Sequence, residues 1–239
     1  MMKRRDFIGT AALAIASLPG GNTLLGAETK SEVTKGLTIA KAKLTPPVKG
    51  RIPVAVLISE GVTVIDFAGP WEVFQDTMIG DEMPFQLFTV SEKIETLTAS
   101  AGLKLVPDYS FENVPECKMI VIPAQKGSDA MRAWLRKAWP TSDVTMSVCT
   151  GAFQLAKAGL LDDKEATTHH DFLDKLEKDF PKVKVKRGVR FVEGERISTA
   201  GGLSSGIDLA LRVVERYYGR DAARKTAAYM EYQGTGWII

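Results

Sequence analysis

The chain alternates short, continuously apolar runs with longer segments in which apolar residues recur at helical spacing. Four apolar runs have the length of β-strands, at residues 52–58, 85–90, 119–123 and 144–148. Runs without alternating polar residues are typical of strands that are covered on both faces. Helical patterns occupy residues 129–138, 152–158, 172–180, 204–218 and 221–231. The alternation predicts an α/β fold, a doubly wound, mostly parallel sheet with helices on both faces.

Weaker patterns add detail to this outline. Gly69-Pro70 is a start signal that predicts a helix from Pro70. Shorter strands are predicted at residues 103–106 and 166–168. Gly194-Glu195 separates two short runs, at 190–193 and 196–199, and predicts a hairpin.

The first residues have a different character from the rest. Lys3, Arg4 and Arg5 precede an apolar stretch at residues 10–18, and small residues follow up to Ala27. This order is that of a signal peptide, and the paired arginines before Phe-Ile resemble a twin-arginine signal. A membrane anchor is the alternative, but the apolar core is short for a bilayer of roughly 30 Å. We expect export to the periplasm, with no stable membrane insertion after cleavage.

The chain therefore divides into three parts. Residues 1–27 are the predicted signal, residues 28–50 a polar linker or arm that closes with two prolines, and residues 51–239 the α/β domain. The 239 residues hold 31 basic and 29 acidic side chains. Since residues 1–27 contain three basic side chains and one acidic, the remainder holds 28 of each and is formally neutral. A neutral domain gives no reason to expect a nucleic-acid partner.

Three candidate segments follow predicted strands. Asp66 comes after the first strand, Ala124-Gln125 after the strand at 119–123, and Cys149 after the strand at 144–148. Ligands of open α/β sheets bind beyond the carboxyl ends of the strands. The three segments are therefore predicted to meet in one site for a small molecule.

Cys149 lies where a predicted strand passes through a small residue and a glycine into a helix. The N-terminal end of a helix favours a thiolate over a thiol, and a thiolate is a nucleophile. A buried structural cysteine is the alternative interpretation. The only other cysteine, Cys117, precedes a different strand, and we expect no bridge between the two.

Other residues near these strand ends offer supporting chemistry. Asp66 lies within an apolar stretch, where burial and a nearby thiolate would raise its pKa and suit it to proton transfer; its alternative role is a helix N-cap. Thr150 can orient a substrate through its hydroxyl and stabilise an anion through its N–H. His169 is either a base partner of Cys149 or a structural hydrogen-bonding group. No His/Cys cluster has zinc-ligand spacing, and neither a metal nor another cofactor is expected.

Several separated motifs resemble the DJ-1/PfpI (ThiJ/PfpI) superfamily, which has the fold of class I glutamine amidotransferases. They are similar to its isonitrile hydratase branch and to the amidase-like domains of AraC-type regulators. The motifs are residues 65–74, 147–152, 158–161, 166–169, 199–202 and 206–211.

The resemblance implies a flavodoxin-like sandwich, commonly dimeric, with the cysteine on a strained turn between strand and helix. It implies that Cys149 is the nucleophile, Asp66 the catalytic acid and Thr150 the residue beside the cysteine. Thr150 stands where the protease-like branch has histidine, which is evidence against peptidase activity. Hydratases usually have Pro-Gly-Gly after the strand at 119–123, where this chain has Pro123-Ala124-Gln125.

Two functions from different classes remain open on the sequence. One is an isonitrile hydratase-like lyase that hydrates a small electrophile; the other is a periplasmic ligand-sensing or stress-related binding module without turnover. In either case the residues expected to contact the small molecule, besides the catalytic three, are Gln125, Ala124, Gly69 and His169. A homodimer is expected from the resemblance.

Overall fold

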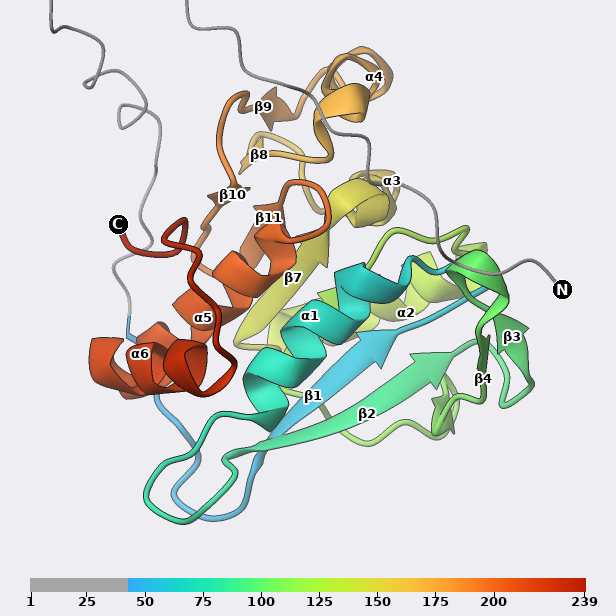
Figure 1. The fold of residues 1–239 in the computed structure, drawn as a ribbon. Coiled ribbons are helices and arrows are strands. Elements are labelled where there is room, and N and C mark those ends of the chain that lie inside the picture. Colours follow the sequence, from blue (N-terminus) through green and yellow to red (C-terminus); the bar gives the residue numbers. More distant parts are fainter. Residues whose placement is uncertain (1–42) are drawn as a thin grey trace, which may run out of the picture. The chain divides into compact units, whose positions relative to one another are not determined.

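The computed structural model describes residues 43–239 (Figure 1). The predicted signal at residues 1–27 and most of the predicted arm lie outside the described residues. No helix within the described part has the length and apolar content needed to cross a bilayer.

A seven-stranded sheet forms the centre of the domain. Its strand order is β10-β11-β7-β6-β1-β2-β5, and every neighbouring pair is parallel except β10 and β11. The strands are β1 (Ile52–Leu57), β2 (Phe85–Ser91), β5 (Tyr109–Ser110), β6 (Met119–Ile122), β7 (Val144–Val148), β10 (Phe191–Val192) and β11 (Ile197–Ala200). The predicted mostly parallel sheet and the predicted hairpin at Gly194-Glu195 are both confirmed.

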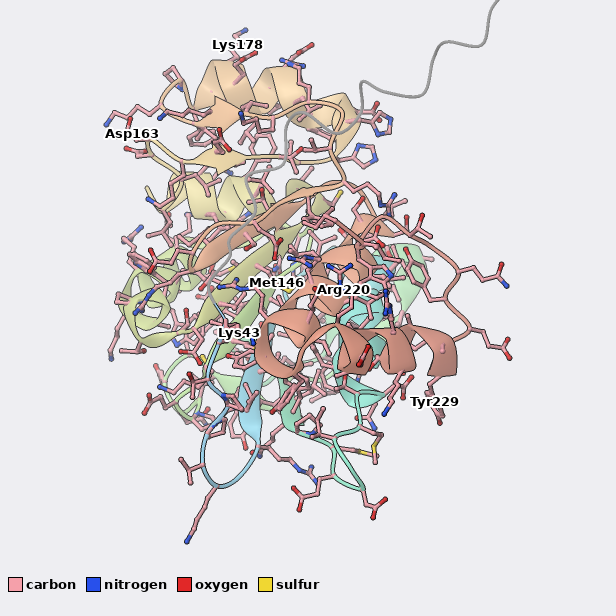
Figure 2. The ribbon with its side chains drawn as sticks, turned by 90° about the vertical axis from the view of Figure 1, so that its left-hand side faces the viewer. Lys43, Met146, Asp163, Lys178, Arg220 and Tyr229 are labelled. Atoms are coloured by element: carbon pink, nitrogen blue, oxygen red, sulfur yellow. The ribbon has the colours of Figure 1, made fainter. Side chains whose placement is uncertain are left out.

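Helices cover both faces of this sheet, as the sequence predicted. They are α1 (Val64–Gln75), α2 (Asp129–Ala138), α3 (Ala152–Lys157), α4 (Leu173–Asp179), α5 (Ser205–Tyr218) and α6 (Arg220–Tyr229). One apolar core lies between the sheet and α1, α5 and α6, and the other between the sheet and α2, α3 and α4. Figure 1 shows α1 and α5 in front of the strands and α2 behind them. In Figure 2 the buried Met146 lies in the middle, with Lys178 of α4 and Tyr229 of α6 far apart at the periphery.

Two predicted short strands belong to separate ribbons rather than to the main sheet. β4 (Lys104–Leu105) pairs antiparallel with β3 (Leu97–Thr98), so the strand predicted at 103–106 lies outside the seven strands. β8 (Glu165–Ala166) pairs with β9 (Lys184–Val185) and ends before the predicted Thr168. Each strand of these ribbons is two residues long, and the partner strands β3 and β9, which the sequence did not predict, are too short to show a periodic pattern.

α1 begins earlier than the sequence predicted, whereas α2 begins at Asp129, the first residue of its predicted pattern. α1 starts at Val64, with Thr63 at its N-cap, so Pro70 lies inside the helix and Asp66 in its first turn. Pro70 lacks the N–H that would continue the helical ladder, but it is buried and packs beside Gly206 of α5, so tertiary contacts outweigh the local cost. In α2 the cap is Ser128, whose hydroxyl accepts the Met131 N–H at 3.1 Å, and Asp129 is the first helical residue.

The strand order places a switch point beside β1. From β1 the chain first builds β2 and β5 on one side, then returns to add β6, β7 and β11 on the other. At such a point, connections leave neighbouring strands toward opposite faces and open a crevice beyond their carboxyl ends. The residues that follow β1, β6 and β7 include Asp66, Ala124 and Cys149, so the topology brings the three predicted segments together.

A buried ion pair joins α5 to Glu193, the residue that follows β10. Arg212 donates to Glu193 at 3.1 Å through Nε and contacts it at 3.0 Å through Nη2, and both side chains are almost fully buried. Burial raises the pKa of Glu193, which the Arg212 charge opposes. Removing one partner of such a pair leaves the other as an unpaired buried charge, which is destabilising.

We therefore expect Arg212→Ala to lower the free energy of unfolding by about 3–5 kcal/mol, measured by urea denaturation. Arg187→Ala is the matched control, because Arg187 pairs with Asp174 and Glu177 on the exposed surface and should cause no measurable change. An Arg212→Ala protein as stable as the control would contradict this account.

Candidate active site

Cys149 lies on a sharp turn between β7 and a short helix. Its φ angle is +57°, in the left-handed region that non-glycine residues rarely adopt. A 3₁₀ turn over Cys149–Gly151 follows, and α3 continues from it. The predicted strained turn between strand and helix is therefore present, and such strain is concentrated at functional sites.

The surrounding chain holds this turn from both sides. The Cys149 N–H donates to the Gly201 carbonyl at 2.8 Å, and the Cys149 carbonyl accepts the buried Thr168 hydroxyl, also at 2.8 Å. Gly151 passes directly over the end of β6, where a Cβ atom would overlap the Ile122 carbonyl. Only glycine allows this close approach.

Asp66 faces Cys149 from the first turn of α1. The Asp66 side chain is fully buried, and its Oδ2 accepts the Ala124 N–H at 3.1 Å. Its Oδ1 is buried without a hydrogen-bond partner within residues 43–239. A carboxylate oxygen left in this state has capacity to accept a proton or a hydrogen bond.

Burial raises the pKa of Asp66 to about 6. Four interactions oppose that rise: the Ala124 N–H, the Cys149 thiol, the charge of His169 and the Leu203 N–H. The prediction of a raised pKa at Asp66 is confirmed. A carboxyl group with this pKa can both accept and donate a proton near neutral pH.

The thiolate predicted at Cys149 is contradicted by its surroundings. Burial, and next the neighbouring Asp66 carboxylate, raise the pKa of Cys149 to about 11. The Thr150 and Leu203 N–H groups lower it, as the helix-terminus argument anticipated, but by less. The sequence could not show which of these opposing effects on the pKa of Cys149 is larger, because burial of the sulfur depends on how the rest of the fold packs over it.

Asp66 and Cys149 consequently titrate as a pair. Between pH values of about 6 and 11 they hold one proton, which resides on sulfur, where it can be donated to the carboxylate. Transfer of that proton to Asp66 yields a thiolate beside a carboxylic acid, with no change in net charge. The geometry therefore provides a thiolate at the moment of attack rather than in the resting protein.

Thr150 is placed as the sequence predicted, beside the sulfur. Its backbone N–H interacts with Cys149, and its half-buried hydroxyl has no hydrogen-bond partner within residues 43–239. That hydroxyl is available to a bound molecule.

The Ala124-Gln125 turn reaches the site in a different way from the one predicted. The Ala124 N–H is bound to Asp66, so it supports the carboxylate rather than an oxyanion. The Gln125 side chain donates to the Leu57 carbonyl at 3.0 Å, at the end of β1. Gln154 holds the turn in place by donating to the carbonyl of Lys126 at 3.2 Å.

Gly69 and His169 lie at the periphery of the pair. A Cβ atom on Gly69 would meet Ile207 of α5, so the structure gives Gly69 a position in helix packing, and its contact with substrate stays a prediction. The His169 ring packs against Gly202, and its Nδ1 accepts the Asp171 N–H at 3.3 Å. His169 acts on Asp66 only through its charge and is absent from the groups that shift the pKa of Cys149. The structure therefore supports the structural alternative over a base partner.

Both cysteines are free, as expected. Cys117 belongs to the core on the α2 face and Cys149 to the core on the α1 face, so the sheet separates them. Within the described residues, one group of side chains has the types and spacing to hold a metal ion: His169, His170 and Asp171. It lies beside the Asp66–Cys149 pair and includes neither member.

Two residues of the site were not predicted. Leu203 contributes its backbone N–H to both Cys149 and Asp66 from a loop position with φ of +51°. A backbone donor carries no side-chain signature, and the preceding Gly201-Gly202 was the only available signal. Thr168 lies in a recognised motif, but its partner is a carbonyl, which no sequence pattern identifies.

We expect Thr168→Val to slow alkylation of Cys149 by iodoacetamide by about tenfold, which corresponds to loss of one hydrogen bond of typical strength. The variant keeps the side-chain shape but releases the Cys149 carbonyl. Thr168→Ser, which retains the hydroxyl, should react at the wild-type rate. Intact mass against time measures the rates, and equal rates for Val and Ser would refute the positioning role.

Comparisons with known proteins agree with this fold. Residues 53–216 match the model of the DJ-1/PfpI family. The isonitrile hydratase of Pseudomonas putida is 30% identical over 190 residues, which cover 76% of this chain and 78% of that protein. A THiJ/PfpI family protein from Pseudomonas syringae superimposes with a TM-score of 0.69 at 25% identity, covering 77% of this chain and 76% of that chain.

The same family includes regulators. The HTH-type transcriptional regulator CdhR of Pseudomonas aeruginosa is 30% identical over 130 residues, which cover 52% of this chain and 38% of CdhR. The aligned region is therefore a minor part of that regulator. Kinship with a hydratase and with regulators is compatible with either catalysis or ligand binding at this site.

Proposed function

The chain belongs to the DJ-1/PfpI family, and we propose that it is an isonitrile hydratase-like lyase that adds water to a small electrophile. The observation that carries the proposal is the buried Asp66–Cys149 pair. Burial raises both pKa values, to about 6 for Asp66 and about 11 for Cys149, and the pair holds one transferable proton at neutral pH. Pairs of titratable groups with separated pKa values are how proteins assign acid and base roles.

The first step forms a bond between the Cys149 sulfur and the terminal carbon of an isocyanide, R–N≡C. Asp66 takes the thiol proton and delivers it to that same carbon, giving the thioimidate R–N=CH–S–Cys149. Sulfur and proton thus both add to one carbon, and Asp66 returns to its carboxylate form. In this step the Thr150 hydroxyl orients the bound molecule, a role supported by the contact of the Thr150 N–H with Cys149.

The second step consumes water. Asp66, again a carboxylate with an unpartnered Oδ1, takes a proton from a water molecule as its oxygen attacks the thioimidate carbon. Asp66 passes that proton to the nitrogen, which gives the adduct R–NH–CH(OH)–S–Cys149. The C–S bond then breaks, and the hydroxyl proton of the adduct is transferred to the sulfur as the C=O bond forms. The products are the N-formamide R–NH–CHO and free Cys149. The overall reaction converts R–NC and one water molecule to R–NH–CHO.

Purified protein is expected to convert an aryl isocyanide to its N-formamide, followed by chromatography with the uncatalysed background subtracted. Cys149→Ala removes the nucleophile and should abolish turnover. Asp66→Asn keeps the shape of the side chain but cannot transfer a proton, and we expect at least about a hundredfold loss.

The pH profile of the same assay tests the direction of proton transfer. Because Asp66 must be ionised to accept the thiol proton, kcat/KM should rise with pH through about 6 and then stay level up to about pH 9. The variant Asp66→Asn should lack the acidic limb. Turnover by Cys149→Ala, or a wild-type rate that falls as pH rises through 6, would contradict the mechanism.

A second candidate is a ligand-binding module without turnover. It is supported by the pKa of about 11 at Cys149, since a resting thiol reacts slowly, and by the kinship with regulators. This function predicts saturable binding of the isocyanide to wild type and to Cys149→Ala alike, seen as equal shifts in melting temperature, with no formamide produced.

We also propose that residues 1–27 direct export through a twin-arginine signal and that the domain acts in the periplasm as a homodimer. Replacing Arg4 and Arg5 by Lys keeps the charge, yet should retain the full-length chain in the cytoplasmic fraction of a bacterium with this export route. Light scattering of the purified domain measures its mass. Unchanged periplasmic recovery of the variant with Lys at positions 4 and 5 would contradict the export proposal. A monomeric mass would contradict the proposed homodimer.

A further inference from the structure

Three consecutive residues at the start of the 3₁₀ turn η4 (His170–Phe172) bring together two imidazoles and a carboxylate. His169, His170 and Asp171 each present one ligand-type atom, and these atoms lie within 4.8 Å of one another. His169 and His170 are the only histidines in the whole chain. Their rings stack with centroids 4.3 Å apart, and each ring has one nitrogen near the Asp171 carboxylate.

The distances between these atoms are those of ligands around a metal ion. The His170 Nε2 lies 3.1 Å from Asp171 Oδ1, and the His169 Nδ1 lies 3.7 Å from Asp171 Oδ2. Metal–nitrogen and metal–oxygen bonds of about 2.0–2.1 Å in a tetrahedral arrangement place neighbouring ligand atoms about 3.4 Å apart. The observed separations fall on either side of that spacing.

The His169 Nδ1 is directed toward Asp171, because its lone pair accepts the Asp171 N–H at 3.3 Å. A metal ion bound at Nδ1 would replace this long hydrogen bond at the same lone pair. Gly202 and the Phe172 ring, whose centroid is 5.9 Å from that of His169, fix the imidazole in place. An ordered first ligand reduces the entropy lost when an ion binds.

We propose that His169 Nδ1, His170 Nε2 and the Asp171 carboxylate bind one divalent transition-metal ion of the zinc, nickel or copper class. Imidazole nitrogens select these ions over magnesium and calcium, which prefer sites made of oxygen. Three protein ligands leave a fourth position for water. The His170 and Asp171 side chains are 80% and 66% exposed, so the ion can enter directly from solvent.

This site is separate from the Asp66–Cys149 pair and does not depend on hydratase activity. His169 packs against Gly202, next to Leu203, whose N–H reaches the pair. A bound ion would therefore fix one wall of the candidate active site without entering it.

The test uses tag-free, full-length protein treated with a chelator and titrated with Zn²⁺, then separately with Ni²⁺, in a calorimeter. One ion should bind per chain. His170→Ala and Asp171→Asn should each weaken binding by at least about tenfold, and both positions are exposed, so the variants are expected to fold. Asp174→Asn is the matched control, because it removes a nearby exposed carboxylate that pairs with Arg187 instead.

A second measurement identifies the ligands directly. With only two histidines in the chain, long-range ¹H–¹⁵N spectra should show Zn²⁺ shifting the Nδ1 of one ring and the Nε2 of the other. The proposal is overturned if wild type shows no saturable binding, if His170→Ala and Asp171→Asn bind as tightly as Asp174→Asn, or if the ring nitrogens do not shift.

Discussion

The candidate site depends on one electrostatic constraint: a carboxylate and a thiol are buried face to face with one proton between them. The carboxylate could not remain there alone at low cost, because it is ionised in water and the interior penalises that form. The thiol is neutral and tolerates burial. The Ala124 and Leu203 N–H groups supply Asp66 with the support that water would otherwise give. These donors come from the ends of β6 and from the loop after β11, so the strand order of the sheet is what makes the pair tolerable.

The same constraint explains why the cysteine stands on a strained turn. A left-handed residue at the end of β7 turns the thiol away from the strand and toward α1, where Asp66 lies. The Gly201 carbonyl and the Thr168 hydroxyl hold the two backbone groups of that residue, and Gly151 lets the turn pass close over β6. The cost of the strain is met by contacts from three separate segments, which is how such conformations persist.

Sequence reasoning reached the fold and the members of the pair but not the state of the pair. Continuous apolar runs identify the buried strands, and strand ends in a parallel sheet converge, so Asp66, Ala124 and Cys149 could be grouped in advance. The position of the proton could not be predicted, because it depends on how deeply the sulfur and the carboxylate are each buried. Thr168 and Leu203 act through a carbonyl and an N–H, groups that every residue carries. The start of α1 was misplaced because packing of Pro70 against α5 overrode a local rule.

The donors of this site favour one class of chemistry over another. Acyl transfer needs N–H groups left free for a developing oxyanion, and here the Ala124 N–H is already bound to Asp66 in the resting protein. Adding a thiol across an isocyanide carbon develops no oxyanion, because the carbon that gains sulfur also gains the proton. What that reaction needs is a carboxylate able to take a proton from sulfur and return it to carbon nearby. The turn at Ala124-Gln125 therefore supports the proton carrier through a backbone N–H, and this use of the N–H counts against peptidase chemistry more than against hydration.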